Sequence, residues 1–291
     1  MRTRSSLSLA LVTLGVGLLA AYLAQPSFLY FPRKYSLREL EESEAALRKH
    51  GFNLVQAGSS YLVTSSAAGS ESPTVNVFVL LGGNGMTALD WSHWVIDVHP
   101  FVKSESATSL FVLVEYPGYG KDEGQTSPDS MHSSVSSAVD FALSHINTSG
   151  KNLGEVNVLG HSMGAAVGTR WVGETSIEVS RLILSAPFTS VSDMVSEVFP
   201  FIPRVIGKLI ARHDWDNHAS ISKIAIRGKA KRVILVHGRA DEIVPFRMVE
   251  ELARIKSVSL IPIENASHNG ILSFIRVYGL LLTAPLVSKD E

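Results

Sequence analysis

The sequence contains no cysteine among its 291 residues. Disulfide bonds, thiol nucleophiles and cysteine-based zinc sites are therefore excluded. The chain also has no excess of either charge, since 26 Lys and Arg stand against 27 Asp and Glu and leave a net charge of −1. Without a basic face, nucleic acid is not an expected partner. The lack of thiols suits both oxidising and reducing compartments, so it does not fix the location.

The length and apolar content fit one folded domain. Hydrophobic residues make up 45% of the chain, which is enough to bury one sizeable core, and α/β domains of this size are commonly undivided. We expect an N-terminal segment over residues 1–27 and a single folded domain over residues 28–291.

Residues 7–24 form a run of about 18 residues without a charge, near the lower limit for a helix that crosses a bilayer. A secretory signal peptide is the alternative. Signal cleavage requires small residues at positions −1 and −3, and a cut after Ala24 would place Tyr22 at −3. We therefore expect an uncleaved, single-pass membrane anchor, in an internal membrane or at the cell surface. Its orientation stays open, because basic residues flank the run on both sides: Arg2, Arg4, Arg33, Lys34 and Arg38.

Apolar runs and amphipathic patterns alternate through the rest of the chain. Ser36 and Glu39 form a capping box for a helix that ends at Gly51, and a hairpin is expected over 52–64. Further strands are predicted over 75–81, 109–116, 156–159, 181–185, 232–236 and 258–263, and helices over 91–98, 135–143, 246–255 and 271–282. Apolar strands that alternate with helices predict a parallel sheet with helices on both faces.

The stretch 188–228 stands apart from this alternation. It carries the apolar sequence Phe199-Pro200-Phe201-Ile202-Pro203, followed by Val205, Ile206, Leu209 and Ile210. We expect a helical insertion here, which is either a lid over the functional site or an ordinary packing helix.

The sequence Gly160-His161-Ser162-Met163-Gly164 follows an apolar run and precedes small or apolar residues that can begin a helix. This pattern predicts a sharp strand–turn–helix elbow that lifts the Ser162 side chain above the sheet edge and needs small residues at both flanks. Gly-x-Ser-x-Gly also occurs in turns without chemistry. A serine hydroxyl becomes a good nucleophile when a base removes its proton, so the hypothesis requires a histidine and a carboxylate elsewhere.

Asp241 and His268 are the candidates for these partners. Each follows a predicted strand, and ligand sites of open α/β sheets form at the carboxyl ends of the strands. The order Ser, Asp, His is one of the known orders of such triads. Taken alone, Asp241 is better explained as a helix N-cap and His268 as a loop histidine, and it is their joint occurrence in this order that favours the triad. Glu242 is a second candidate carboxylate, but we prefer the shorter Asp241 and leave Glu242 to solvent. His237 is interpreted as a structural residue at a strand end.

Two backbone N–H groups are needed to stabilise the charge on the carbonyl oxygen of a tetrahedral intermediate. We assign one to Met163, which follows the candidate nucleophile, and one to Asn84 in the glycine-rich loop 82–85, with Gly83 as the alternative. This loop lacks the Gly-x-x-x-x-Gly-Lys and Gly-x-Gly-x-x-Gly patterns of phosphate-binding loops. The remaining histidines lack metal-ligand spacing, so neither a metal nor another cofactor is expected.

The motif around Ser162, the sequence from His237 to Pro245 and the sequence Ala266-Ser267-His268 resemble those of the α/β-hydrolase-fold serine hydrolases. The chain is also similar to one group among these hydrolases. The similarity lies in Tyr116-Pro117-Gly118-Tyr119-Gly120 and in Phe28-Leu29-Tyr30-Phe31-Pro32, which follows the expected anchor. This group consists of membrane-anchored α/β-hydrolase-domain proteins, which include monoacylglycerol lipases, lysophospholipid lipases and protein depalmitoylases.

The resemblance covers roughly residues 28–291 and implies the α/β-hydrolase fold. That fold is a mostly parallel sheet with helices on both faces, here with a small helical lid. The chain departs from the group at one motif. Many relatives have His-Gly-Asn in the oxyanion loop, whereas this chain has Gly82-Gly83-Asn84.

Together these residues predict acyl transfer from an ester to water. Ser162 attacks the carbonyl, His268 passes the proton to the leaving alcohol, and Asp241 orients the imidazole, so activity should rise with pH through about 6.5. A serine nucleophile disfavours the dehalogenase and epoxide-hydrolase chemistries of the same fold. Because an anchor holds the site near lipid, we expect a lipid ester such as a monoacylglycerol or a lysophospholipid. A protein S-acyl thioesterase and a non-catalytic, membrane-tethered interaction protein are the alternatives.

Overall fold

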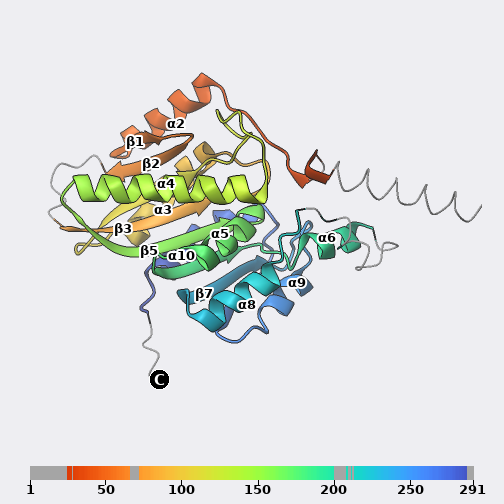
Figure 1. Cartoon of the computed structure of the whole chain (residues 1–291). Coiled ribbons are helices and arrows are strands. Elements are labelled where there is room, and N and C mark those ends of the chain that lie inside the picture. Colours follow the sequence, from red (N-terminus) through yellow and green to blue (C-terminus); the bar gives the residue numbers. More distant parts are fainter. Residues whose placement is uncertain are drawn as a thin grey trace, which may run out of the picture.

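The computed structural model describes residues 25–27, 29–65, 72–199, 208, 211 and 213–286. Within these residues, eight strands form one sheet in the order β1-β2-β4-β3-β5-β6-β7-β8 (Figure 1). β2 pairs antiparallel with β1 and β4, and all neighbours from β4 to β8 pair in parallel. The strands are β1 (Phe52–Ala57), β2 (Ser60–Ser65), β3 (Thr74–Leu81), β4 (Thr108–Val114), β5 (Asn152–His161), β6 (Val179–Ser185), β7 (Ala230–Gly238) and β8 (Val258–Ile263).

Helices cover both faces of this sheet and enclose one apolar core on each. Along β3, Val77, Val79 and Leu81 point into the first core, whereas Phe78 and Leu80 point into the second, because side chains alternate along a strand. The first core is covered by α4 (Pro128–Thr148), α5 (Met163–Glu174), α8 (Asn217–Arg227) and α9 (Phe246–Leu252), and the second by α2 (Leu37–Lys49), α3 (Trp91–Val102) and α10 (Ile275–Thr283). The predicted fold class is confirmed.

Most predicted elements are present, with shifted ends. The hairpin over 52–64 corresponds to β1 and β2, and the strand over 258–263 to β8. The capping box at the start of α2 is formed, since the Ser36 hydroxyl accepts the N–H of Glu39 and the Glu39 carboxylate accepts the N–H of Ser36. The helix predicted over 271–282 is wrong in its first turn. It is divided into a 3-10 turn, η2 (Gly270–Ser273), and α10, because Phe274 between them is not helical.

Two helices of the stretch 188–228 are described. α6 (Val191–Val198) follows the carboxyl end of β6. α8 packs against α5 with Ile221 and Ile224 fully buried, and it ends at Gly228 in the left-handed conformation. α8 is therefore an ordinary packing helix of the first core. Because α8 packs in the core, the lid predicted within 188–228 is restricted to α6 and the residues between α6 and α8.

The predicted anchor over residues 7–24 lies outside the described residues. Between Gln25 and Leu286, the described parts of the chain contain no helix that is both long and apolar enough to cross a membrane.

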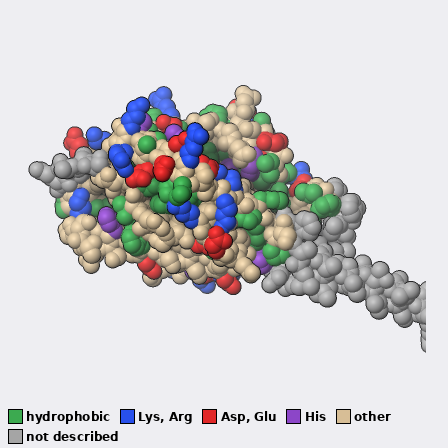
Figure 2. All heavy atoms as spheres, turned by 90° about the horizontal axis from the view of Figure 1, so that it is seen from above, with side chains coloured by type: hydrophobic (Ala, Val, Ile, Leu, Met, Phe, Trp, Pro, Cys, Tyr) green, Lys and Arg blue, Asp and Glu red, His purple; other side chains and the backbone are tan. Residues whose placement is uncertain are grey.

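Charged side chains of both signs share the surface. Figure 2 shows Lys and Arg side chains lying among Asp and Glu side chains on the face seen from above. On the exposed side of α2, Arg38 pairs with Glu42 and Arg48 pairs with Glu44, each at a spacing of four residues. The balance between positive and negative charges in the composition is thus also found locally on the surface.

Candidate active site

Ser162 occupies the sharp turn between the end of β5 and the start of α5. Its φ of 53° and ψ of −113° fall in a region that residues with a side chain rarely adopt. Hydrogen bonds on both sides hold this conformation: the Ser162 N–H donates to the carbonyl of Ser185 at 2.8 Å, and the Ala165 N–H donates to the carbonyl of Ser162 at 3.0 Å. The predicted strand–turn–helix elbow is present.

Two glycines make the elbow sterically feasible. A Cβ atom on Gly160 would overlap the carbonyl group of Gly164, and a Cβ atom on Gly164 would overlap the carbonyl group of Leu81 at the end of β3. The start of α5 therefore approaches both strands too closely for any other residue. This close approach accounts for the Gly-x-Ser-x-Gly spacing.

His268 lies between Ser162 and Asp241. Its Nε2 is 2.9 Å from the Oγ of Ser162, and its Nδ1 is 2.8 Å from the Oδ2 of Asp241. Ser162 follows β5, Asp241 follows β7 and His268 follows β8. The carboxyl ends of these parallel strands share one edge of the sheet. The His268 residue is 4% exposed and the Asp241 side chain is fully buried, so water does not compete for their contact. With Nδ1 protonated, Nε2 can accept the serine proton.

The Asp241 carboxylate is fixed by its own loop. Its Oδ1 accepts the N–H of Ile243 at 2.9 Å and the N–H of Val244 at 2.7 Å. Burial acts to raise the pKa of Asp241, but the hydrogen bonds from His268 and Val244 outweigh it, and the pKa lies below its ordinary value of 3.8. Asp241 is therefore ionised at neutral pH.

His237 is buried and supports the same loop, in line with its structural interpretation. Its Nε2 donates to the carbonyl of Val244 at 3.0 Å. Burial lowers the pKa of His237 below 6.5, so the ring is neutral at neutral pH.

Glu242 is exposed to solvent, as expected, but it also makes a contact that was not predicted. Its Oε2 accepts the backbone N–H of His268 at 3.1 Å, across 26 residues of sequence. The two neighbouring carboxylates thus hold different parts of one residue. Asp241 holds the imidazole of His268, and Glu242 holds its backbone.

Met163 and Asn84 are the predicted oxyanion donors. Met163 follows Ser162 in the sequence, and Asn84 lies in the loop after β3, which comes close to Ser162 in space. Among the described residues, neither the Met163 N–H nor the Asn84 N–H donates a hydrogen bond; Met163 is the first residue of α5 and has no intrahelical acceptor. A Cβ on Gly83 would lie 3.5 Å from the Cβ of Ser162, so the loop after β3 passes beside the hydroxyl. The Gly83 N–H is directed at the Sδ of Met86 at 3.2 Å. This favours Asn84 over Gly83 as the second oxyanion donor, and the assignment stays a prediction.

A buried polar network behind the candidate triad was not predicted. The Nδ1 of His161 lies 3.2 Å from the Oγ of Ser185, which in turn lies 2.7 Å from the hydroxyl of Tyr278. The His161 ring is 5.1 Å from the ring of His268. Burial lowers the pKa of His161 to about 3, so this ring adds no positive charge beside His268. The sequence offered one signal for this network, which is that His161 directly precedes Ser162 in the motif.

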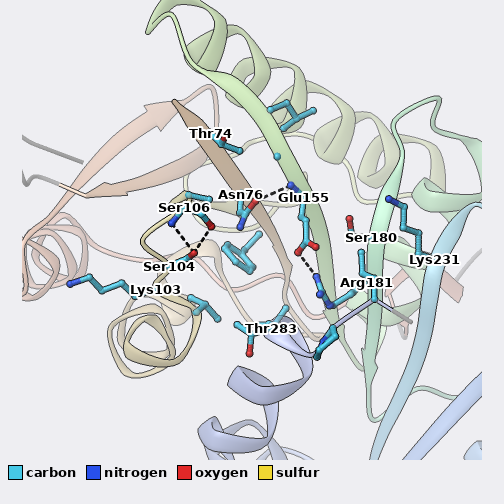
Figure 3. A pocket seen from close by; sticks show the side chains of 18 of the residues that line it. Thr74, Asn76, Lys103, Ser104, Ser106, Glu155, Ser180, Arg181, Lys231 and Thr283 are labelled. Atoms are coloured by element: carbon cyan, nitrogen blue, oxygen red, sulfur yellow. Dashed lines mark hydrogen bonds and ion pairs between the residues drawn. The ribbon is translucent and has the colours of Figure 1, made fainter. Parts of the chain in front are cut away.

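A groove of about 1150 Å³ lies at the opposite edge of the sheet, where β3, β5 and β6 begin (Figure 3). Arg181 is 2% exposed there and pairs with Glu155. It also donates to the Oδ1 of Asn157 at 3.0 Å and to the carbonyl of Ala284 at 2.6 Å, which ties the end of α10 to the sheet. None of the predicted site residues lines this groove. In the parts of the chain that the structure describes, no group of three or more His, Asp or Glu side chains could hold a metal ion.

A mostly parallel sheet that carries Ser, Asp and His at the carboxyl ends of three strands is the arrangement of α/β hydrolases. Residues 78–228 match the profile of the alpha/beta hydrolase family, and this match spans about half of the chain. The chain belongs to this family.

Curated relatives include two eukaryotic proteins. Protein bem46 of Schizosaccharomyces pombe is 29% identical over 187 residues, which cover 64% of this chain and 57% of that protein. The alpha/beta hydrolase domain-containing protein WAV2 of Arabidopsis thaliana is 30% identical over 145 residues, which cover 46% of this chain and 44% of that protein. The chain thus spans about half the length of the curated relatives it matches.

Solved structures with the same fold include two esterases. The Pyrococcus furiosus esterase Pf2001 superposes with a TM-score of 0.56 at 17% identity, covering 81% of this chain and 92% of that chain. Est1E from Butyrivibrio proteoclasticus, with bound ferulic acid, superposes with a TM-score of 0.56 at 14% identity, covering 80% and 99%. At these identities the likeness shows the fold alone.

Proposed function

We propose that this hydrolase is a serine esterase that cleaves carboxylic esters. The observation that carries the proposal is the position of His268, whose two ring nitrogens lie 2.9 Å from the Ser162 hydroxyl and 2.8 Å from the Asp241 carboxylate. The strained conformation of Ser162 is a second support, because such strain persists where the surrounding structure enforces it and is common at active sites.

Acylation uses the triad and both oxyanion donors. The Oγ of Ser162 attacks the carbonyl carbon of the ester while its proton passes to Nε2 of His268. The tetrahedral oxyanion accepts hydrogen bonds from the N–H groups of Met163 and Asn84. When the bond between the carbonyl carbon and the alcohol oxygen breaks, His268 gives the proton to that oxygen and leaves Ser162 acylated.

Deacylation repeats these steps with water in place of the serine hydroxyl. His268 takes a proton from water as the water oxygen attacks the acyl carbon, and the same donors hold the second oxyanion. The bond to the Oγ of Ser162 then breaks, Ser162 regains its proton from His268, and the carboxylic acid is released. Asp241 stays ionised throughout and stabilises the imidazolium in both halves.

We propose a lipid ester of the monoacylglycerol or lysophospholipid type as the substrate. Three apolar side chains are exposed near the carboxyl edge of the sheet: Phe31 is 61% exposed, Val198 63% and Phe199 45%. The chain segment of Phe31 and α6 lie at the same end of the molecule (Figure 1). The segment also follows the predicted anchor, which would place this end at a membrane. Exposed apolar side chains beside an active site suit an acyl chain or a lipid surface.

Release of fatty acid by the full chain tests the substrate class. The chain and its Ser162→Ala variant would be incubated with a monoacylglycerol, a lysophosphatidylcholine and an S-palmitoylated peptide. The proposal predicts fatty acid from one of the two lipids at a rate well above that from the peptide, and none above background with Ser162→Ala. Faster release from the peptide would replace the lipid substrate by a protein thioester. Equal release above background by the chain and its variant would exclude Ser162 as the nucleophile, and no release by either would indicate a non-catalytic protein.

A further inference from the structure

The side chain of Asn84 joins the loop after β3 to the first described residues of the chain. We name residues 29–35 the N-terminal strap. The Nδ2 of Asn84 donates to the carbonyl of Leu29 at 2.7 Å, and its Oδ1 accepts the N–H of Phe31 at 2.9 Å. Asn84 is exposed, so these bonds are not needed to satisfy a buried amide. They determine where the loop lies.

A third bond to Asn84 comes from the turn after β4. The hydroxyl of Tyr119 donates to the Oδ1 of Asn84 at 2.8 Å. Tyr119 is fully buried and packs edge-on against Tyr116, whose own hydroxyl donates to the carbonyl of Gly82 at 3.1 Å. Two buried tyrosines therefore hold the same loop together with the strap.

The strap is itself fixed by Arg33. The carbonyl of Arg33 accepts the N–H of Gly120 at 2.8 Å, and its Nε donates to the carbonyl of Gly85 at 3.3 Å. Its guanidinium binds the carboxylate of Asp90 at 2.6 Å and the hydroxyl of Thr87 at 3.1 Å. The strap is thus tied to the turn after β4 and to the residues that follow Asn84, and the Asn84 amide has fixed partners.

The other contacts of this loop are made by the residues on either side of Asn84. Gly82, Gly83 and Gly85 surround Asn84, and glycine has more backbone freedom than any other residue. Within the loop, the Met86 N–H donates to the carbonyl of Gly83 at 3.1 Å, which restrains the loop across Asn84 but does not touch the Asn84 N–H itself. The bonds of the Asn84 side chain therefore contribute to the direction of that N–H.

We infer that Asn84 is a positioning residue, whose side chain, held by the N-terminal strap and Tyr119, fixes its backbone N–H where the oxyanion forms. This inference rests on the proposed esterase function. A donor stabilises the transition state when it lies about 2.7 to 3.1 Å from the oxyanion, so a displaced donor lowers kcat more than it changes KM. The segment next to the predicted anchor is then part of the catalytic machinery.

The test compares Asn84→Ala with Asn76→Ala in the full chain. Asn76 is a matched control, because its Oδ1 accepts a backbone N–H, that of Glu155 at 2.9 Å, at the opposite end of β3. For hydrolysis of p-nitrophenyl butyrate, Asn84→Ala should lower kcat about 10- to 100-fold and change KM less than about threefold. The inhibition constant of a trifluoromethyl ketone, which forms a tetrahedral adduct with the serine, should rise by the same factor as kcat falls. Asn76→Ala should leave all three values within about threefold of the unmodified chain.

Two further measurements keep the outcome decisive. The pH dependence of kcat/KM should keep its midpoint in Asn84→Ala, because the contacts of His268 with Asp241 and Ser162 are untouched. Tyr119→Phe removes one bond to Asn84 and should lower kcat about two- to tenfold, which carries the test if Asn84→Ala does not fold. The inference would be overturned if the kcat of Asn84→Ala equalled that of Asn76→Ala. If Asn84→Ala does not fold, the same comparison is made with Tyr119→Phe. Undiminished hydrolysis by Ser162→Ala would instead overturn the esterase function, whatever Asn84→Ala does.

Discussion

The Nε2 of His268 lies 2.9 Å from the Oγ of Ser162, although 106 residues of sequence separate the two. The topology of the sheet produces this contact. β5, β6, β7 and β8 are successive parallel neighbours, so the residues that follow β5 and β8 emerge at the same edge. Between them, β7 delivers Asp241, whose carboxylate holds the imidazole on its other side at 2.8 Å.

Asp241→Asn should lower kcat about 10³- to 10⁴-fold for any ester substrate. The amide would keep the size of the side chain but could donate to Nδ1 of His268, which would favour the wrong tautomer of the imidazole. The steady-state rate of ester hydrolysis measures the effect.

Glu242→Gln is the matched control for that variant. Its amide oxygen can still accept the N–H of His268, so kcat should stay within about threefold of the unmodified chain. A loss as large as that of Asp241→Asn would show that the wrong carboxylate has been assigned to the imidazole.

Gly164→Ala should destabilise the fold by about 3 kcal/mol and reduce activity, because its Cβ would overlap the carbonyl of Leu81 and push α5 away from β3. Gly173→Ala in the same helix is the control. Its Cβ would meet the Cγ1 of Ile224 at 3.9 Å, an ordinary contact, and alanine should add about 0.5 to 1 kcal/mol of helix stability. Urea unfolding measures both. Equal stability of the two variants would contradict the close approach described for the elbow.

The carboxyl group of Glu115 should make the stability of the protein depend on pH. Glu115 is 1% exposed, and its carboxylate accepts the N–H of Ala88 at 3.2 Å. Burial raises the pKa of Glu115 to about 8, against an ordinary value of 4.5. Between these two values the unfolded chain has lost a proton that the folded chain retains, so the contribution of Glu115 to stability is greatest below about pH 4.5 and falls as pH rises towards 8.

Glu115→Gln removes this titration and provides the comparison. Relative to the variant, the free energy of unfolding of the unmodified chain should fall by about 1 kcal/mol per pH unit between pH 5 and 8 and then level off. Urea unfolding at a series of pH values measures the difference. Parallel curves for the two proteins over this range would show that Glu115 titrates alike in the folded and unfolded chains.

The candidate triad could be predicted from the sequence because its signals are local. Ser162, Asp241 and His268 each follow an apolar run by a few residues, and parallel strands bring their carboxyl ends to one edge. Gly160 and Gly164 marked the elbow in the same way, since steric demand at a sharp turn leaves few other residues.

The supports of the site could not be predicted, because they join residues that are distant in sequence. The Asn84 side chain contacts Leu29 across 55 residues, and Ser185 contacts Tyr278 across 93. The insertion of β4 between β2 and β3 also leaves no pattern within any one segment. Such contacts follow from strand order and packing, which hydrophobic periodicity does not encode.

Labelling by a fluorophosphonate probe tests the central claim most directly, because the probe forms a covalent bond with a serine only when that serine is activated as a nucleophile. The full chain should be labelled, and Ser162→Ala should not be, while its unfolding curve stays that of a folded protein. Equal labelling of Ser162→Ala, or no labelling of the unmodified chain under conditions in which it is folded, would contradict the account.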